Sequence, residues 1–159
     1  MENEFDDEGF LESRFLEKSY QEAMNLTQDV ANYLEAESQK TRLNLKDAKN
    51  YDINYASESM RLSACLMEVM SWYLVQKSVA AGEITIKQMG DLDFRLGGRA
   101  ICLSDGDTSK SNLPAEFVFY LKKVQDIYQQ VSRIDAMLYE KHEIANPVHE
   151  MVNRLNKKD

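Results

Sequence analysis

The stretch that decides the fold is residues 52–81, DINYASESMRLSACLMEVMSWYLVQKSVAA, which carries apolar side chains at helical spacing along its whole length. Two near-heptad stripes run along it. The first stripe consists of Ile53, Ala56, Met60, Ser63, Met67, Met70 and Leu74. The second stripe consists of Tyr55, Ser59, Leu62, Leu66, Val69, Tyr73 and Gln76. At 100° per residue the mean directions of the stripes differ by roughly 110°, so this helix can pack against two neighbours.

The C-terminal end of this helix carries a third apolar sector, formed by Trp72, Val75 and Val79. A helix that is apolar on every side must be covered on every side. We therefore expect a symmetric homodimer, because a two-fold contact covers the same patch on both copies. The candidate interface residues, for the dimer or another partner, are Met60, Met67, Trp72, Val75 and Val79.

An intramolecular lid is the alternative cover for this end of the helix. It would be formed by the apolar residues that follow Gly82, which are Ile84, Ile86, Met89, Leu92, Phe94, Leu96 and Ile101. The methionines of the helix also leave two interpretations open. We expect each of Met60, Met67 and Met70 to fill a gap in the core, and an adaptable binding surface is the other role that suits methionine.

Two further long helices are predicted. The first spans about residues 10–36 and places Leu16, Tyr20, Ala23, Thr27, Val30 and Leu34 on one face. The last opens at Pro114 and ends near Ile144, ahead of Asn146-Pro147. Its seam consists of Phe117, Leu121, Val124, Tyr128, Val131 and Leu138, joined by Tyr120, Ile127 and Ile134.

The remaining segments predict connections and tails. Residues 39–50 are a polar connection, Gly82 ends the second helix, and Thr85-Ile86-Lys87-Gln88 matches a capping box that opens a short helix to Gly90. Residues 103–112 form a mobile polar loop, residues 1–9 an acidic disordered tail, and residues 145–159 a tail or short helix. The predicted fold is all-α: an elongated antiparallel three-helix bundle over residues 10–144, with a long connection between its second and third helices.

Composition indicates a soluble, acidic, globular protein. The 159 residues fit one domain, and their formal net charge of −8 disfavours binding to nucleic acid or to an anionic membrane. The N-terminal stretch has no apolar run of the signal-peptide kind, and no stretch reaches the ~20 apolar residues of a membrane span. We expect a cytoplasmic protein, in which Cys65 and Cys102, 37 residues apart, are ordinary reduced thiols.

Catalytic and metal-binding chemistry has little support in this sequence. The Glu-x-x-His pairs of a di-iron bundle are missing, and the Asp105–Glu116 stretch has Lys110 where a calcium loop requires glycine. We expect no enzyme activity, cofactor or metal. Glu58, Arg61 and Glu68 lie on one helix face, either as an exposed ion pair or as a partly buried cluster that fixes helix register or specifies a partner.

The second helix resembles the core motif of an alphaproteobacterial family, the regulator of CtrA degradation, RcdA, first catalogued as a domain of unknown function. The motif residues are Tyr55, Glu58, Ser59, Met60, Arg61 and Leu62, followed by Leu66-Met67, Ser71-Trp72 and Gly82-Glu83. Leu113-Pro114 and the run from Tyr128 to Asp135 are similar to its third-helix signature. The resemblance is good over residues 51–90, moderate over 113–139 and weak over 15–35.

This resemblance implies a dimeric, non-enzymatic adaptor. Its partners would be the ClpXP protease machinery, other adaptor factors and a CtrA-like transcription regulator that the protease degrades. The alternative function is a helical dimeric signalling or scaffold module that binds a response regulator and has no part in proteolysis.

Overall fold

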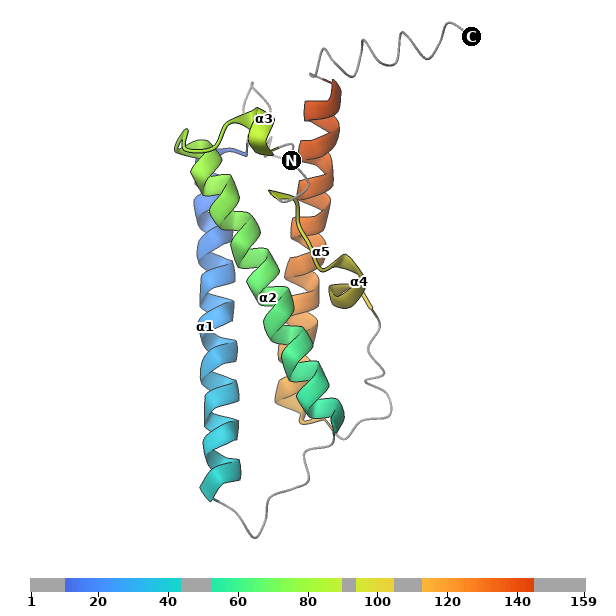
Figure 1. Ribbon diagram of the computed structural model, residues 1–159. Helices are drawn as coiled ribbons and strands as arrows, with labels where there is room; N and C mark the ends of the chain where they lie inside the picture. The colour runs from blue at the N-terminus through green and yellow to red at the C-terminus, as the bar shows by residue number, and fades with distance from the viewer. Residues whose placement is uncertain (1–10, 44–52, 90–93, 105–112, 145–159) are drawn as a thin grey trace, which may run out of the picture.

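The computed structural model describes residues 11–43, 53–89, 94–104 and 113–144, and every regular element within them is a helix (Figure 1). Three long helices pack together: α1 (Ser13–Leu43), α2 (Ile53–Ala80) and α5 (Ala115–Ile144). Two one-turn helices, α3 (Ile86–Met89) and α4 (Arg99–Cys102), lie between α2 and α5 in the chain. The prediction of an all-α protein built on three long helices is confirmed. The expected tails 1–9 and 145–159, loop residues 105–112 and Leu92 of the expected lid lie outside the described residues.

Helices α1 and α2 run antiparallel, as expected. Near one end of the pair, Lys77 Nζ of α2 lies 3.0 Å from Glu17 Oε2 of α1. One turn further along, the ring of Tyr73 contacts the ring of Tyr20 edge-on, with 6.4 Å between centroids. The residue number rises on one helix as it falls on the other, which is the register of antiparallel neighbours.

Helices α2 and α5 run parallel, and here the antiparallel prediction is wrong. Tyr55 contacts Phe117 with 4.7 Å between ring centroids, and further along the pair Trp72 forms a hydrogen bond with Asp135. The residue numbers of α2 and of α5 therefore rise in the same direction. The reason is the length of the connection. Residues 81–114 can span well over the ~42 Å of α2, so the chain returns to the starting end of the bundle before α5 begins (Figure 1).

Most helix ends follow the local signals. Gly82, two residues after the end of α2, adopts φ 74, and Pro114 directly precedes α5. The capping box at α3 is formed, because the Thr85 backbone N–H donates to Gln88 Oε1 at 3.0 Å and the Gln88 N–H donates to Thr85 Oγ1 at 3.3 Å.

Helix α1 extends further than its apolar stripe predicted, to Leu43 instead of about residue 36. Side-chain pairs one turn apart support this polar end. Lys40 Nζ lies 2.6 Å from Glu37 Oε1, and Gln39 Nε2 donates to Glu35 Oε1 at 3.0 Å. Helix α4 was not predicted at all, because four residues are too few to show a period.

The core lies where α1 and α5 meet α2. The second stripe of α2 is buried there, which confirms that it faces the bundle interior: Leu62, Leu66, Val69, Tyr73 and Gln76 are all buried. The predicted seam of α5 is also buried, with Phe117, Tyr128 and Val131 each 0% exposed. Tyr33 of α1 closes one end of this core by ring contacts to Phe117 and Tyr120.

The third apolar sector of α2 is covered within one chain. Trp72 is 2% exposed and Val79 is 8% exposed, while Val75 is half-buried. Trp72 Nε1 donates to Asp135 Oδ1 of α5, and the Leu96 N–H, from the segment considered as a lid, donates to the same oxygen, whereas Ile101 of that segment is 54% exposed. Trp72 and Val79 are therefore core residues of the single chain, and they do not present a surface to a partner.

The first stripe of α2 faces outward, which corrects the expectation that Met60 and Met67 fill gaps in the core. Met60 is 75% exposed and Met67 is 72% exposed, whereas Met70 is half-buried. The two neighbours of α2 use the second stripe and the Trp72 sector, so Ile53, Met60, Met67 and Leu74 of the first stripe stay exposed in the part of the chain that the structure describes.

Candidate functional site

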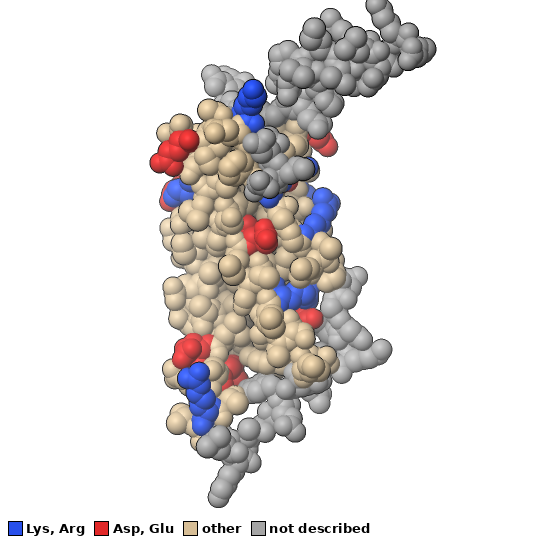
Figure 2. All heavy atoms as spheres, viewed as in Figure 1, with Lys and Arg blue, Asp and Glu red and all other residues tan. Residues whose placement is uncertain are grey.

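The exposed stripe of α2 is the first part of the candidate site. We call it the outer face of α2 and define it by Ile53, Ser57, Met60, Ala64, Met67, Ser71 and Leu74, all of which are exposed. Every exposed residue of α2 is uncharged, although 29% of the whole chain is charged. Figure 2 shows the result as a broad area with few charged atoms along the middle of the molecule. Large exposed apolar patches of this kind mark interaction surfaces.

Large and small side chains alternate along the outer face. The large residues Ile53, Met60, Met67 and Leu74 recur every seven positions, and the small residues Ser57, Ala64 and Ser71 lie four positions after the first three of them. A strict seven-residue repeat is the spacing of helices that pair along a seam. The small residues leave room between the large ones along this face.

The residues of the resemblance motif divide between core and surface. Leu62 is 2% exposed and Tyr55 packs on Phe117, whereas Met60 belongs to the outer face. Ser59 donates its hydroxyl to the Tyr55 carbonyl oxygen at 2.7 Å, a local bond within the helix.

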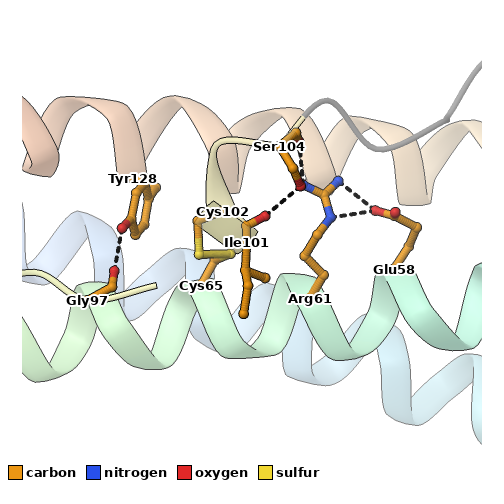
Figure 3. Close-up of a disulfide and its surroundings, with 8 residues drawn as sticks. All are labelled: Glu58, Arg61, Cys65, Gly97, Ile101, Cys102, Ser104 and Tyr128. Carbon is orange, nitrogen blue, oxygen red and sulfur yellow. Dashed lines mark hydrogen bonds and ion pairs between the residues drawn. A yellow bond between two sulfur atoms is a disulfide. The ribbon is translucent and has the colours of Figure 1, made fainter. Parts of the chain in front are cut away.

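Glu58 and Arg61 of the motif form a partly buried ion pair, the second of the two arrangements considered for them. Arg61 Nη2 lies 2.6 Å from Glu58 Oε2, and the two side chains are only 11% and 16% exposed. Arg61 also donates from Nη1 to the Ser104 carbonyl oxygen at 3.1 Å (Figure 3). The pair therefore joins α2 to a segment that follows α4.

Residues 94–104, which we call the strap, form the second part of the site. The strap runs along α2 in the opposite direction, so Gly97 lies beside Glu68 and Ser104 lies beside Arg61 (Figure 3). Space beside Glu68 is tight, because a Cβ atom on Gly97 would lie 2.7 Å from Glu68 Oε2. Glu68 therefore does not join the Glu58–Arg61 pair but packs on the strap backbone.

A disulfide joins the strap to α2, and it corrects the expectation of two reduced thiols. Cys65 of α2 and Cys102 of α4 have Cα atoms 5.6 Å apart, inside the usual range for a disulfide (Figure 3). The sequence did not predict this contact, because the two cysteines are 37 residues apart and come together only where the chain returns along α2. Both side chains are buried, Cys65 at 4% and Cys102 at 1% exposure.

Asp135 of α5 is a buried acidic residue that forms hydrogen bonds with both α2 and the strap. Its Oδ1 accepts a hydrogen bond from Trp72 Nε1 at 2.9 Å and another from the Leu96 backbone N–H at 3.4 Å. Its Oδ2 lies 3.3 Å from Arg95 Nη2, and the Arg95 guanidinium in turn stacks 3.8 Å from the centre of the Tyr139 ring. The Asp135 side chain, which is 11% exposed, thus has both a charge partner and neutral donors, which offset the cost of its burial.

Two tyrosines next to this region have raised pKa values. The hydroxyl of Tyr128 donates to the Gly97 carbonyl oxygen, and burial, followed by the negative charge of Glu68, raises the pKa of Tyr128. Burial raises the pKa of Tyr73 to about 12. Both phenols are therefore neutral hydrogen-bonding groups at neutral pH.

The described residues offer little for catalysis. No group of three or more His, Cys, Asp or Glu side chains among them could hold a metal ion. A shallow depression is lined by residues 12–14, 17, 18, 21, 22 and 25, which makes it the outer surface of one helix and not a cleft between elements. Within the same residues, no helix is long and apolar enough to cross a membrane.

The sequence profile of a family described as "Protein of unknown function (DUF1465)" matches residues 7–158. The chain belongs to the DUF1465 family. No curated protein and no solved structure matches this DUF1465 chain. The family therefore covers nearly the whole bundle, including α2, the strap and α5, and its description assigns no activity.

Sequence reasoning missed two parts of this site in the DUF1465 chain, the disulfide and the hydrogen bond between Trp72 and Asp135. For Met60 and Met67 it left both a core and a surface position open, and both side chains are exposed. One signal was available for Asp135, because an acidic residue follows Ile134 on the otherwise apolar seam of α5. Such a residue needs a buried partner, and an indole N–H is a suitable donor.

Proposed function

We propose that this DUF1465 protein is a non-enzymatic adaptor that brings a CtrA-like transcription regulator to the ClpXP protease in the cytoplasm. The observation that carries the proposal is the outer face of α2, an exposed uncharged surface that includes Met60 of the motif resembling the RcdA family. An adaptor acts by tethering. Simultaneous contact with substrate and protease raises the local substrate concentration and needs no bond chemistry, cofactor or nucleic acid.

The same proposal includes a homodimer that pairs two copies of the outer face. In an antiparallel pair with its two-fold axis beside Ser63 and Ala64, Met60 lies opposite Met67 of the second copy, and Ile53 lies opposite Leu74. Each large residue then lies opposite a large residue of the second copy, and small residues beside it leave room for the contact. The surface is therefore complementary to a second copy of itself. This interface keeps Met60 and Met67 from the sequence prediction and replaces the buried Trp72 and Val79 by Ile53 and Leu74.

Sedimentation velocity tests the dimer. We expect the wild type to sediment at twice its chain mass of 18.4 kDa at micromolar concentration. The double variant Met60→Glu, Met67→Glu should sediment at the chain mass with unchanged helicity, because it places charges opposite one another in an apolar seam. Met137→Glu is a matched control, since Met137 is exposed on α5 and lies outside the outer face. A monomeric wild type would exclude the dimer.

Reconstituted degradation tests the adaptor. Adding the protein to ClpXP, a CtrA-like substrate and the other adaptor factors should speed degradation, and the Met60→Glu, Met67→Glu variant should do so less. No change in rate on adding the wild type would contradict the proposal. A pull-down then distinguishes the alternative module, which would recover a response regulator without protease components.

A further inference from the structure

The disulfide joins the strap to the bundle and does not join the long helices to one another. Helix α2 makes its own contacts with α1 and with α5, including the Tyr20–Tyr73 and Tyr55–Phe117 ring contacts. We propose that Cys65 and Cys102 form a reversible redox site that fastens the strap to α2 when oxidised and releases it when reduced by a dithiol. The inference concerns the isolated chain and does not depend on the proposed adaptor function.

Apart from the disulfide, the strap is held by polar contacts that are in part solvated and by Leu96 and Leu103, which pack half-buried against the core. Arg95 is 34% exposed and lies 3.3 Å from Asp135 Oδ2, and the Leu96 N–H bond to Asp135 is 3.4 Å long. The bond from Arg61 to the Ser104 carbonyl oxygen is exposed, and α4 is a single turn. Each polar contact of this kind contributes little by itself, so the covalent bond is the strongest single restraint on the strap.

Reduction transfers two electrons from the dithiol to the disulfide. One reductant thiolate attacks the Cys65 or Cys102 sulfur, and the sulfur–sulfur bond breaks as a mixed disulfide forms. The second reductant thiolate then displaces the protein sulfur. The two protons of the dithiol end on Cys65 and Cys102, and the reductant becomes a cyclic disulfide. Because both cysteines are buried, the attack requires local opening of the strap.

The cellular compartment also favours reversibility. Dithiol reductants keep thiols reduced in the cytoplasm expected from the sequence, and disulfides that form there are mostly transient or redox-sensing. The strap contains a single-turn helix and its leucines are only partly buried, so a covalent bond at Cys102 can control its position.

Release of the strap uncovers specific core residues. The Leu96 N–H donates to the Asp135 oxygen that also accepts from Trp72, and the Gly97 carbonyl oxygen accepts the hydrogen bond of Tyr128. Trp72 is the only tryptophan of the chain, so its emission reports on this site alone. The strap also contains two trypsin sites, Arg95 and Arg99, whose cleavage requires an unfolded backbone.

The experiment compares oxidised protein with protein reduced by excess dithiothreitol and alkylated at both thiols. We expect reduction to shift Trp72 emission to longer wavelength and to speed cleavage after Arg95 and Arg99 about tenfold or more, while far-ultraviolet circular dichroism keeps the helical signal. The double variant Cys65→Ser, Cys102→Ser should show the reduced behaviour with or without dithiothreitol. Mass spectrometry of the cleaved peptides assigns the sites.

Two results would overturn the proposal. The first is a fully alkylated wild type that keeps the emission and the protection of the oxidised protein, because the strap would then hold without the bond. The second is loss of the whole helical signal on reduction, since the disulfide would then be a brace for the bundle. The wild-type comparison decides between these outcomes even if the double variant does not fold.

Discussion

At the scale of single residues, Asp135 is the buried carboxylate that interacts with Trp72 of α2 and with Arg95 and Leu96 of the strap. Asp135→Ala should lower the free energy of unfolding by about 1–3 kcal/mol, because the buried Trp72 N–H loses its acceptor. Asp135→Asn should cost less, since the amide oxygen still accepts from Trp72. Urea titration measures both variants. Asp126→Ala is the control, because Asp126 is 61% exposed and lies 3.6 Å from Lys122, so its loss should cost at most about 0.5 kcal/mol.

Tyr73 predicts a second residue-scale effect, a loss of stability at high pH. Burial raises the pKa of Tyr73 to about 12 in the folded chain, whereas the unfolded chain ionises near its ordinary value of 10.0. The unfolded state therefore loses its proton first. The stability that this raised pKa contributes to the folded chain is complete below pH 10 and is lost as the pH rises towards 12. The loss is roughly 3 kcal/mol at most.

The measurement is the free energy of unfolding of wild type and Tyr73→Phe across this alkaline interval. The phenylalanine ring keeps the packing against Tyr20 and lacks the ionisable group. The variant should lose stability less steeply than the wild type as pH rises. Equal slopes in the two proteins would assign the alkaline effect to other groups.

At the scale of elements, two glycines in the left-handed region determine how the chain leaves α2 and enters α4. Gly82 has φ 74, and no atom of the described residues beyond its neighbours lies within 4 Å of where its Cβ would be, so Gly82→Ala should cost only the backbone contribution of about 1–2 kcal/mol. Gly98 has φ 70, and its Cβ would lie 3.2 Å from Glu68 Cγ and 3.4 Å from Cys102 Sγ. Gly98→Ala should therefore cost more than Gly82→Ala. Thermal or urea unfolding ranks the pair, and a reversed order would contradict the close approach of the strap to α2.

At the scale of the whole molecule, the disulfide closes a loop of 37 residues. Chain-entropy arithmetic for that loop gives a stabilisation of roughly 3–4 kcal/mol. Cys65→Ser, Cys102→Ser should lower the free energy of unfolding by up to this amount, and dithiothreitol should lower the wild type equally and leave the variant unchanged. Urea unfolding with and without the reductant makes the comparison. An effect of dithiothreitol on the variant would show that it acts elsewhere.

The main elements were predictable because their signals are local. The heptad stripes of α2, the glycine at position 82, the Thr85–Gln88 capping box and Pro114 each act within a few residues of the chain. Burial of Leu62, Leu66 and Tyr73 followed from the same period. The polar end of α1 was missed because ion pairs and amide pairs support it in place of apolar contacts.

Tertiary structure alone decided which apolar surface of α2 is covered. A period shows that a helix side is apolar, but Met60 and Trp72 carry the same local signal, and only the positions of α1, α5 and the strap bury one and expose the other. The parallel course of α5 has the same origin, since a connection long enough to return along the bundle leaves its direction open. The contact between Cys65 and Cys102 depends on that return, because residues far apart in sequence meet only where the whole chain brings them together.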